Sequence, residues 1–301
     1  MSEATKQRPV TWEAYEATMA RMISPEGIAK GLAFRPRPTD VVISPYSKSG
    51  TTWMQQIVHG LRTRGDMDFD DISRVVPWIE TAHTLGIDLE AEQVSEPRAF
   101  KSHLPGDLVP AGARYIVPFR DPKDALVSLY HFMEGWFFAH GAFTREEFAR
   151  GHFYLRGKKR DYWHHLRTWW ARRDETDVML LTFEGMKADL AGTVRRVAAF
   201  LGLDLDPDLE RVVVEQASLQ FMLAHKDRFD DLLMREHSER NALLPAGSDS
   251  AKVREGKVGA SKVELSADLS AELEELWRDE IEAQIGFASY AEVCDALAQR
   301  I

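Results

Sequence analysis

The stretch Thr39-Asp-Val-Val-Ile-Ser-Pro-Tyr-Ser-Lys-Ser-Gly-Thr-Thr-Trp53 decides how this chain folds. Its apolar first half, up to Pro45, predicts a short buried strand, and Met54–Leu61 continues with the spacing of a helix. A loop that contains Gly50 joins the two. A strand, a glycine loop and a helix within thirty residues predict the opening of a βαβ unit.

The loop Lys48-Ser-Gly-Thr-Thr52 has the chemistry of a phosphate cradle. Gly50 permits a tight turn and a close approach of an anion, while the backbone N–H groups at the following helix start favour negative charge. Lys48 adds a positive charge, and the loop adds the hydroxyls of Ser49, Thr51 and Thr52. The lysine precedes the glycine, unlike in the nucleoside-triphosphate loop. An ordinary helix N-terminus beside an exposed lysine is the alternative.

The rest of the chain alternates strands with helices. Further strands are predicted at Arg98–His103, Ala113–Phe119 and Asp177–Phe183. Further helices are predicted at 11–23, Asp121–Phe138, Asp161–Arg173, Lys187–Leu201, Pro207–Gln216, Ala267–Ile285 and Ser289–Arg300. This order predicts an α/β fold, a single domain over residues 1–301 with a central, mainly parallel sheet flanked by helices. The charged segment 225–256 is expected to be a partly helical, mobile lid.

Composition narrows the class of protein. The 301 residues are 44% hydrophobic and 29% charged, which suits one sizeable core. No apolar run reaches eighteen residues, and Cys294 is the single cysteine, so we expect no membrane span, no zinc site and a cytoplasmic location. The net charge of −10 argues against nucleic-acid binding, so an anionic ligand needs a local positive pocket.

A second anion site is predicted where the strand ending at Phe119 meets the next helix. Arg120 follows that strand, Asp121 is a suitable N-cap and Pro122 suits the first helical position. Ser128 lies two turns further on. Arg120 is thus placed at the carboxyl edge of the sheet, where open α/β folds bind ligands. On composition alone, Arg120 is equally suited to pair with Asp121 or Asp124.

Both segments resemble signatures of the cytosolic-type sulfotransferases. Tyr46–Trp53 is similar to the family's Tyr-Pro-Lys-Ser-Gly-Thr-Thr-Trp loop, with Ser47 in place of proline. Arg120–Phe132 is similar to Arg-(Asn/Asp)-Pro-Lys-Asp-x-x-x-Ser-x-Tyr-x-Phe. The resemblance implies a metal-free transfer of a sulfuryl group from 3'-phosphoadenosine 5'-phosphosulfate (PAPS), with adenosine 3',5'-bisphosphate (PAP) as product.

The resemblance also assigns roles within these two signatures. It places Lys48 on the oxygen that bridges phosphate and sulfate, with Ser49–Thr52 around the 5'-phosphate. Trp53 would stack on adenine, although core packing is the alternative. Arg120 and Ser128 would hold the 3'-phosphate, for which a guanidinium offers paired donors.

Other parts of the donor site depart from the family pattern. Val253–Gly259 resembles Arg-Lys-Gly-x-x-Gly-x-Trp, which implies that Arg254, Glu255 and Gly256 close over the 3'-phosphate. Glu255 replaces a lysine there and Ser261 replaces the tryptophan, and an exposed loop is the alternative. Phe183 stands for an adenine-contacting tyrosine. Ala217-Ser-Leu219 stands for Thr-Ser-Phe, which leaves Ser218 as the matching contact.

Lys101-Ser-His103 supplies the expected catalytic base. The segment ends a predicted strand, and a histidine accepts a proton near neutral pH. It resembles the family's Lys-Thr-His-Leu-Pro, which implies that His103 is the base and that Lys101 assists at the transferring group. The other histidines that draw attention, His59, His131, His164 and His165, are expected to be structural.

The acceptor is less defined by sequence. Side chains expected to line an aromatic pocket are Trp78, Phe137, Phe138 and Phe143. Such a lining favours a small-molecule or glycolipid alcohol or amine. The basic run Arg156–Arg160 is read as a solvated loop, with an anionic acceptor or headgroup as the alternative. The family's dimer motif is poorly kept near Lys262, so a monomer and a homodimer both remain open. Two functional alternatives also stay open: a P-loop small-molecule kinase, and a non-catalytic nucleotide- or glycolipid-binding protein on the same fold.

Overall fold

A parallel sheet forms the centre of the molecule in the computed structural model, which describes residues 6–154, 161–248, 252–253, 256 and 258–300. Its strands are β1 (Val41–Ile43), β2 (Ala99–Lys101), β3 (Arg114–Phe119) and β4 (Val178–Thr182), in the order β2-β1-β3-β4. Every pairing is parallel, and Val42 lies between Phe100 of β2 and Tyr115 of β3. The predicted α/β fold with a mainly parallel sheet is confirmed.

The strand order places a switch point beside β1. From β1 the chain passes through α3 (Thr51–Thr63) to β2 on one side, and then crosses to β3 on the other side. The connections that leave the carboxyl ends of β1 and β3 therefore diverge, and the space between them is where open α/β sheets bind ligands. Both predicted anion loops begin at these two strand ends.

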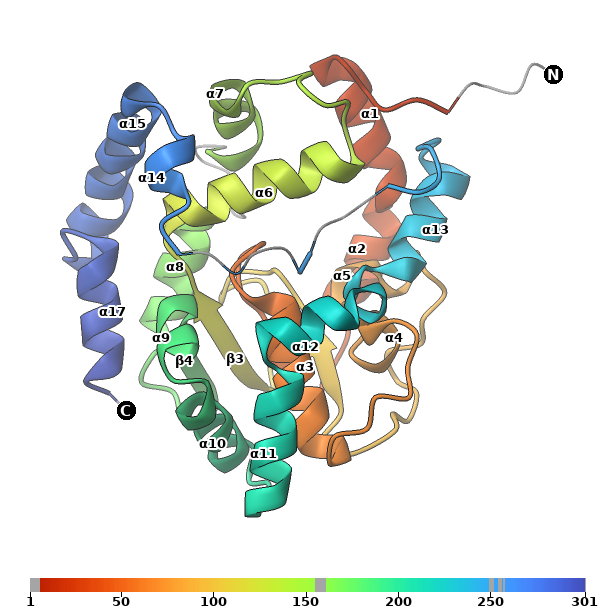
Figure 1. The fold of residues 1–301 in the computed structure, drawn as a ribbon, viewed down its shortest axis with the longest axis vertical. Helices are drawn as coiled ribbons and strands as arrows, with labels where there is room; N and C mark the ends of the chain where they lie inside the picture. The colour runs from red at the N-terminus through yellow and green to blue at the C-terminus, as the bar shows by residue number, and fades with distance from the viewer. Residues whose placement is uncertain (1–5, 155–160, 249–251, 254–255, 257, 301) are drawn as a thin grey trace.

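Strand alternation sorts the apolar residues into two cores. Val41 and Ile43 face the core beneath α3, α10 (Leu190–Leu201) and α11 (Pro207–Gln216). Val42 faces the larger core, which is filled by α6 (Pro122–Trp136), α8 (Tyr162–Ala171) and the C-terminal helices. The helical-spaced tryptophans of α8, Trp163 and Trp169, are fully buried there, as the pattern indicates. Figure 1 shows α3 and α11 side by side, with α12 at their upper end.

The remaining elements surround these layers. They are α1 (Trp12–Met22), α2 (Pro25–Leu32), α4 (Ile72–Val75), α5 (Ile79–Ala82), α7 (Arg145–Phe148), a π-helical turn (Ala149–Phe153), α9 (Phe183–Ala188), α12 (Leu219–Ala224), a 3-10 turn (Lys226–Phe229), α13 (Leu232–Asn241), α14 (Ser261–Glu264), α15 (Ala267–Trp277), a π-helical turn (Arg278–Glu282), α16 (Ala283–Ile285) and α17 (Tyr290–Ala298). Among the described residues, no helix has the length and apolar character needed to cross a membrane.

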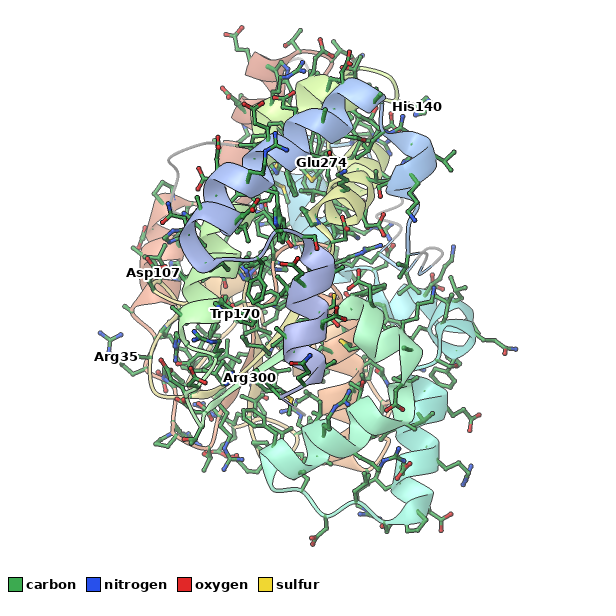
Figure 2. The ribbon with its side chains drawn as sticks, turned by 90° about the vertical axis from the view of Figure 1, so that its left-hand side faces the viewer. Arg35, Asp107, His140, Trp170, Glu274 and Arg300 are labelled. Carbon is green, nitrogen blue, oxygen red and sulfur yellow. The ribbon has the colours of Figure 1, made fainter. Side chains whose placement is uncertain are left out.

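The C-terminal helices cover one side of the molecule. Figure 2 shows this side, with Glu274 on α15 and Arg300 beyond the end of α17. Lys123 of α6 donates to Glu274 at 2.6 Å, and the Trp170 ring meets Phe287 edge-on, with centroids 4.8 Å apart. The first contact links α15 to the N-terminal end of α6, which follows the second anion loop, and the second links α8 to the segment before α17.

The described residues of the segment 225–256 include helices, and several of them pack against the core. Phe229 is fully buried, and Met234 and His237 of α13 are nearly so. Leu233 donates its N–H to the buried carboxylate of Asp71, the N-cap of α4. The described part of this segment is therefore a covering layer of the fold.

Candidate active site

The loop after β1 has the shape of an anion cradle. Lys48 and Gly50 both adopt positive φ angles, 66° and 96°. A Cβ on Gly50 would lie 3.2 Å from the Phe183 ring, so only glycine fits there without displacing it. Gly50 is the N-cap of α3 and offers no side-chain cap, which leaves the first N–H groups of the helix to an outside acceptor. Within the described structure, the buried hydroxyls of Ser49 and Thr51 also have no hydrogen-bond partner.

The two predicted anion loops meet. An Arg120 guanidinium N–H donates to the carbonyl oxygen of Lys48 at 2.8 Å, and Arg120 is 92% buried. Asp121 caps α6 through the Lys123 N–H, and Asp124 accepts the N–H groups of Gly259 and Ser261. Burial lowers the pKa of Arg120, and both carboxylates, Asp124 more than Asp121, oppose this shift. Ser128 is half-buried on the second turn of α6.

Aromatic residues connect the loops with α12. The Phe183 ring lies 4.5 Å from the Arg120 guanidinium carbon and 5.4 Å from the Trp53 ring. Trp53 is half-buried and donates its indole N–H to the Ala217 carbonyl at 2.8 Å. Ser218 uses its hydroxyl to cap α12 by accepting the Phe221 N–H. Phe183 thus keeps a packing role at the position where the resemblance expects a tyrosine.

The third signature loop is described in part. Arg254 and Glu255 lie outside the described residues, as does the basic run Arg156–Arg160. Gly256 has a φ of 55°, and its carbonyl accepts from Lys187 of α9 at 2.6 Å. Further on, Asp124 accepts the N–H groups of Gly259 at 2.6 Å and of Ser261 at 3.0 Å. The loop is therefore fixed to the start of α6, close to Arg120.

His103 is attached to the phosphate loop. Its Nδ1 lies 2.8 Å from the Pro45 carbonyl, which can only accept, so the neutral imidazole carries its proton on Nδ1. Nε2 is then left with a lone pair, as a base requires. The backbone N–H of His103 donates to the buried Glu80 carboxylate at 2.8 Å. Burial, with a smaller effect from Lys101, lowers the pKa of His103 to about 3.

Lys101 lies next to His103 in a group of buried charges. Its ammonium is 4.2 Å from the centre of the Trp78 ring, and that ring meets the His103 ring edge-on at 5.2 Å. Asp231, just before α13, places Oδ1 4.0 Å from the Lys101 Nζ and also pairs with Lys252. Burial lowers the pKa of Lys101 to about 8, although the nearby carboxylates oppose this shift.

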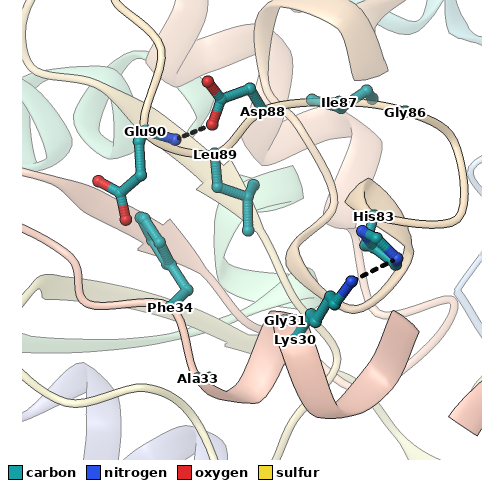
Figure 3. A pocket seen from close by; sticks show the side chains of 10 residues that line it. All are labelled: Lys30, Gly31, Ala33, Phe34, His83, Gly86, Ile87, Asp88, Leu89 and Glu90. Carbon is teal, nitrogen blue, oxygen red and sulfur yellow. Dashed lines mark hydrogen bonds between the residues drawn. The ribbon is translucent and has the colours of Figure 1, made fainter. Parts of the chain in front are cut away.

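Two cavities lie near this region. A small one is lined by Trp78 and Asp231 together with Ser73, Leu233 and Met234. The other, of about 570 Å³, opens between α2 and the loop after α5, where Figure 3 shows Lys30 and His83 joined by a hydrogen bond. It contains none of the predicted site residues. Ile87 lines both cavities, so the loop after α5 forms part of the wall of each.

The expected acceptor lining is partly wrong. Trp78 lines the small cavity, but Phe137, Phe138 and Phe143 are buried core residues, and the last two pack on Tyr15 of α1. The helical pattern did not show which face of this region meets α1. Sequence reasoning also missed Phe132, whose ring lies 4.5 Å from the Lys48 Nζ, and the buried residues around Lys101. Phe132 is part of the second signature, so the sequence contained a sign that it lies near the site. Asp231 and Lys252 come from a charged segment in which nothing indicated that they are near Lys101.

The comparisons with known proteins identify one family. A family model described as "Sulfotransferase domain" matches residues 38–284. The amine sulfotransferase of Oryctolagus cuniculus is 29% identical over 261 residues, 82% of each chain. Sulfotransferase 2A1 of Homo sapiens is 31% identical over 200 residues, 63% of this chain and 68% of that protein.

Two solved structures share the fold. Retinol dehydratase in complex with retinol and PAP superposes with a TM-score of 0.68 and 20% identity, over 93% of this chain and 97% of that one. Mouse sulfotransferase SULT7A1 complexed with PAP superposes with a TM-score of 0.66 and 20% identity, over 92% of this chain and 95% of that one. The family model spans most of the chain and contains both anion loops. The chain therefore belongs to the sulfotransferase domain family and is a PAPS-dependent sulfotransferase, as its two signature loops predicted.

Proposed function

We propose that this enzyme transfers the sulfuryl group of PAPS to a hydroxyl or amine of a small-molecule or lipid-like acceptor by in-line displacement, with His103 as the base. The observation that supports this most strongly is the meeting of three segments at one sheet edge. Arg120 bonds the Lys48 carbonyl, and His103 bonds the Pro45 carbonyl of the same loop. One nucleotide can therefore have a phosphate at each loop while its reacting end faces His103.

The residues present fit such a donor. The unbonded N–H groups at the start of α3 and the unpartnered hydroxyls of Ser49 and Thr51, buried among the described residues, suit a 5'-phosphate. Arg120, with Ser128 and the loop at Gly256, suits a 3'-phosphate. Trp53 and Phe183 offer aromatic surface between them for adenine.

The proposed reaction uses these groups together with His103 and with Lys101, which assists at the transferring group. The acceptor oxygen or nitrogen attacks sulfur, and its proton passes to Nε2 of His103. As the new bond forms, the bond from sulfur to the bridging oxygen breaks, and the electron pair leaves with PAP. Lys48 and the loop N–H groups stabilise the charge that develops on that oxygen. Most of the acceleration then comes from positioning and electrostatics, as in phosphoryl transfer.

The small cavity beside Trp78 is the proposed acceptor site. Trp78, Leu233 and Met234 give it an apolar wall, and its polar lining residues, Ser73 and Asp231, are hydrogen-bonded to each other. The cavity has a volume of about 10 Å³, which is room for about one water molecule, so any acceptor requires the residues around it to move apart. Because Ile87 of the loop after α5 lines both this cavity and the outer one of about 570 Å³, we propose that movement of this loop opens the space for the acceptor.

The pH dependence of turnover tests these roles. We expect kcat/KM to stay level as the pH falls through 6.5, because burial lowers the pKa of His103 to about 3 and the base remains neutral. We expect it to decline as the pH rises through about 8, because Lys101 then loses its proton and its charge. The measurement is PAP release from PAPS between pH 5 and 10. An acid limb centred near 6.5 would contradict the assignment of His103 as a base that is neutral throughout this range.

A further inference from the structure

Asp231 is a buried carboxylate beside Lys101 that takes no part in the proposed transfer step. It lies between the 3-10 turn and α13, with a φ of 52° that is unusual for a residue other than glycine. It is 4% exposed; its partners Ser73 and Lys101 are buried too, and the side chain of Lys252 is 9% exposed. Oδ1 accepts from the Ser73 hydroxyl at 2.9 Å and lies 4.0 Å from the Lys101 Nζ, while Oδ2 pairs with Lys252. Three segments far apart in sequence thus meet at one carboxylate.

Charge balance explains why this carboxylate is tolerated. A buried carboxylate is costly unless it is paired and hydrogen-bonded, and Asp231 has two lysines and a hydroxyl. Burial alone would raise the pKa of Asp231, but Lys101 and Lys252 together hold it well below its usual range. The carboxylate is therefore charged throughout the range in which the enzyme would work.

Lys101 depends on this arrangement. Burial disfavours its charged form and Lys252 disfavours it further, whereas Asp231, Glu80 and Asp71 favour it. His103 lies next to it but remains neutral. Asp231 is the largest of the favourable influences on the ammonium. The 4.0 Å separation between Lys101 Nζ and Asp231 Oδ1 is longer than a direct hydrogen bond. Asp231 therefore stabilises the charge of the ammonium without accepting a hydrogen bond from it.

We propose that Asp231 is a positioning residue for sulfuryl transfer, which holds the Lys101 ammonium at the reacting end of the donor and is itself held there by Lys252 and Ser73. The inference rests on the proposed function, because Lys101 is taken to act on the transferring group. It also makes correct packing of the segment before α13 a condition for turnover.

Two substitutions with opposite expected effects test this role. In Asp231→Asn, the alkaline limb of kcat/KM should move to lower pH by about one unit, because the carboxylate that favours the charged lysine is gone. In Lys252→Met, the limb should move to higher pH, because a repelling charge is gone. PAP affinity should change by less than about threefold in both. Asp230→Asn is the matched control: Asp230 pairs with Arg235, and the limb should stay at the wild-type pH.

A uniform loss of rate in Asp231→Asn with an unmoved limb would show a structural role only and overturn the proposal. So would a limb in Lys252→Met that stays in place or moves downward. The pKa of Lys101 can also be compared between the variants without turnover, by NMR titration of its ¹³Cε signal. This signal is identified as the one that the Lys101→Met variant lacks. If the wild type transferred no sulfuryl group, the proposed function would fail, while this titration would still decide whether Asp231 governs Lys101.

Discussion

His103→Ala is expected to lower kcat by about 10²–10⁴-fold, the usual contribution of a positioned general base, while PAP binds with nearly unchanged affinity. The reason lies in the geometry of the ring. Nδ1 is committed to the Pro45 carbonyl, so Nε2 is the only ring atom available to take the acceptor's proton. Within the described part of the chain, the bond to Pro45 is the one hydrogen bond of this side chain to the phosphate loop. The measurement is single-turnover sulfuryl transfer, together with calorimetric titration of PAP.

His164→Ala is the matched control for this variant. His164 is a partly exposed histidine on α8 that bonds Asp107 at 3.0 Å, outside the proposed site. We expect the transfer rate and the PAP affinity of His164→Ala to equal those of the wild type within about twofold. A His103→Ala enzyme of full activity would remove the base from the mechanism. A loss of PAP binding equal to the loss of rate would make His103 a structural support of the loop.

Lys48→Met is expected to lower kcat by about 10²–10³-fold, in the range found when one preorganised charge-stabilising donor is removed. The positive φ of Lys48 and the Arg120 contact to its carbonyl fix the backbone from which the ammonium extends. Charge develops on the bridging oxygen only as the sulfur–oxygen bond breaks, so the rate should suffer more than the affinity for PAP. Transfer rates and PAP titration in parallel measure the two effects.

Two further variants are compared with Lys48→Met. Lys30→Met removes a lysine of α2 that pairs with Glu26 and His83 at the outer cavity, and it should leave the rate unchanged. Lys48→Arg retains the charge but changes its shape and reach, so an intermediate rate is expected. Equal losses in kcat and in PAP affinity for Lys48→Met would indicate a role in ground-state binding alone.

The sequence was sufficient for the parts of the site that are local in the chain. The strand before Ser44 and the helix after Gly50 are short-range patterns, so the cradle between them could be placed from one continuous stretch. Arg120 was located in the same way, because a strand end and a helix N-cap flank it. From sequence, contact between the two loops could be inferred only from their positions at strand ends. The structure gives the physical reason: β1 and β3 are neighbours in the sheet, so the loops that follow them lie side by side.

Long-range pairings could not be predicted in this way. Asp231 was one acidic residue in a highly charged segment, and nothing local shows that it is buried beside Lys101. The error at Phe138 and Phe143 has a related cause: an aromatic cluster suits a pocket and a core equally well, and only the position of α1 decides between them. Helices α4 and α5 were also missed, since four residues are too few to establish a helical period.

The account depends on the two anion loops binding opposite ends of one nucleotide. Calorimetry of wild type and Arg120→Ala with PAP, with adenosine 5'-monophosphate and with ADP, without Mg²⁺, measures this directly. The wild type should prefer PAP over both other nucleotides by at least about tenfold, and Arg120→Ala should bind PAP no better than the monophosphate, since a lost charged hydrogen bond costs roughly 1.5–3 kcal/mol. Equal affinity of the wild type for PAP and the monophosphate, or an undiminished preference in Arg120→Ala, would contradict it.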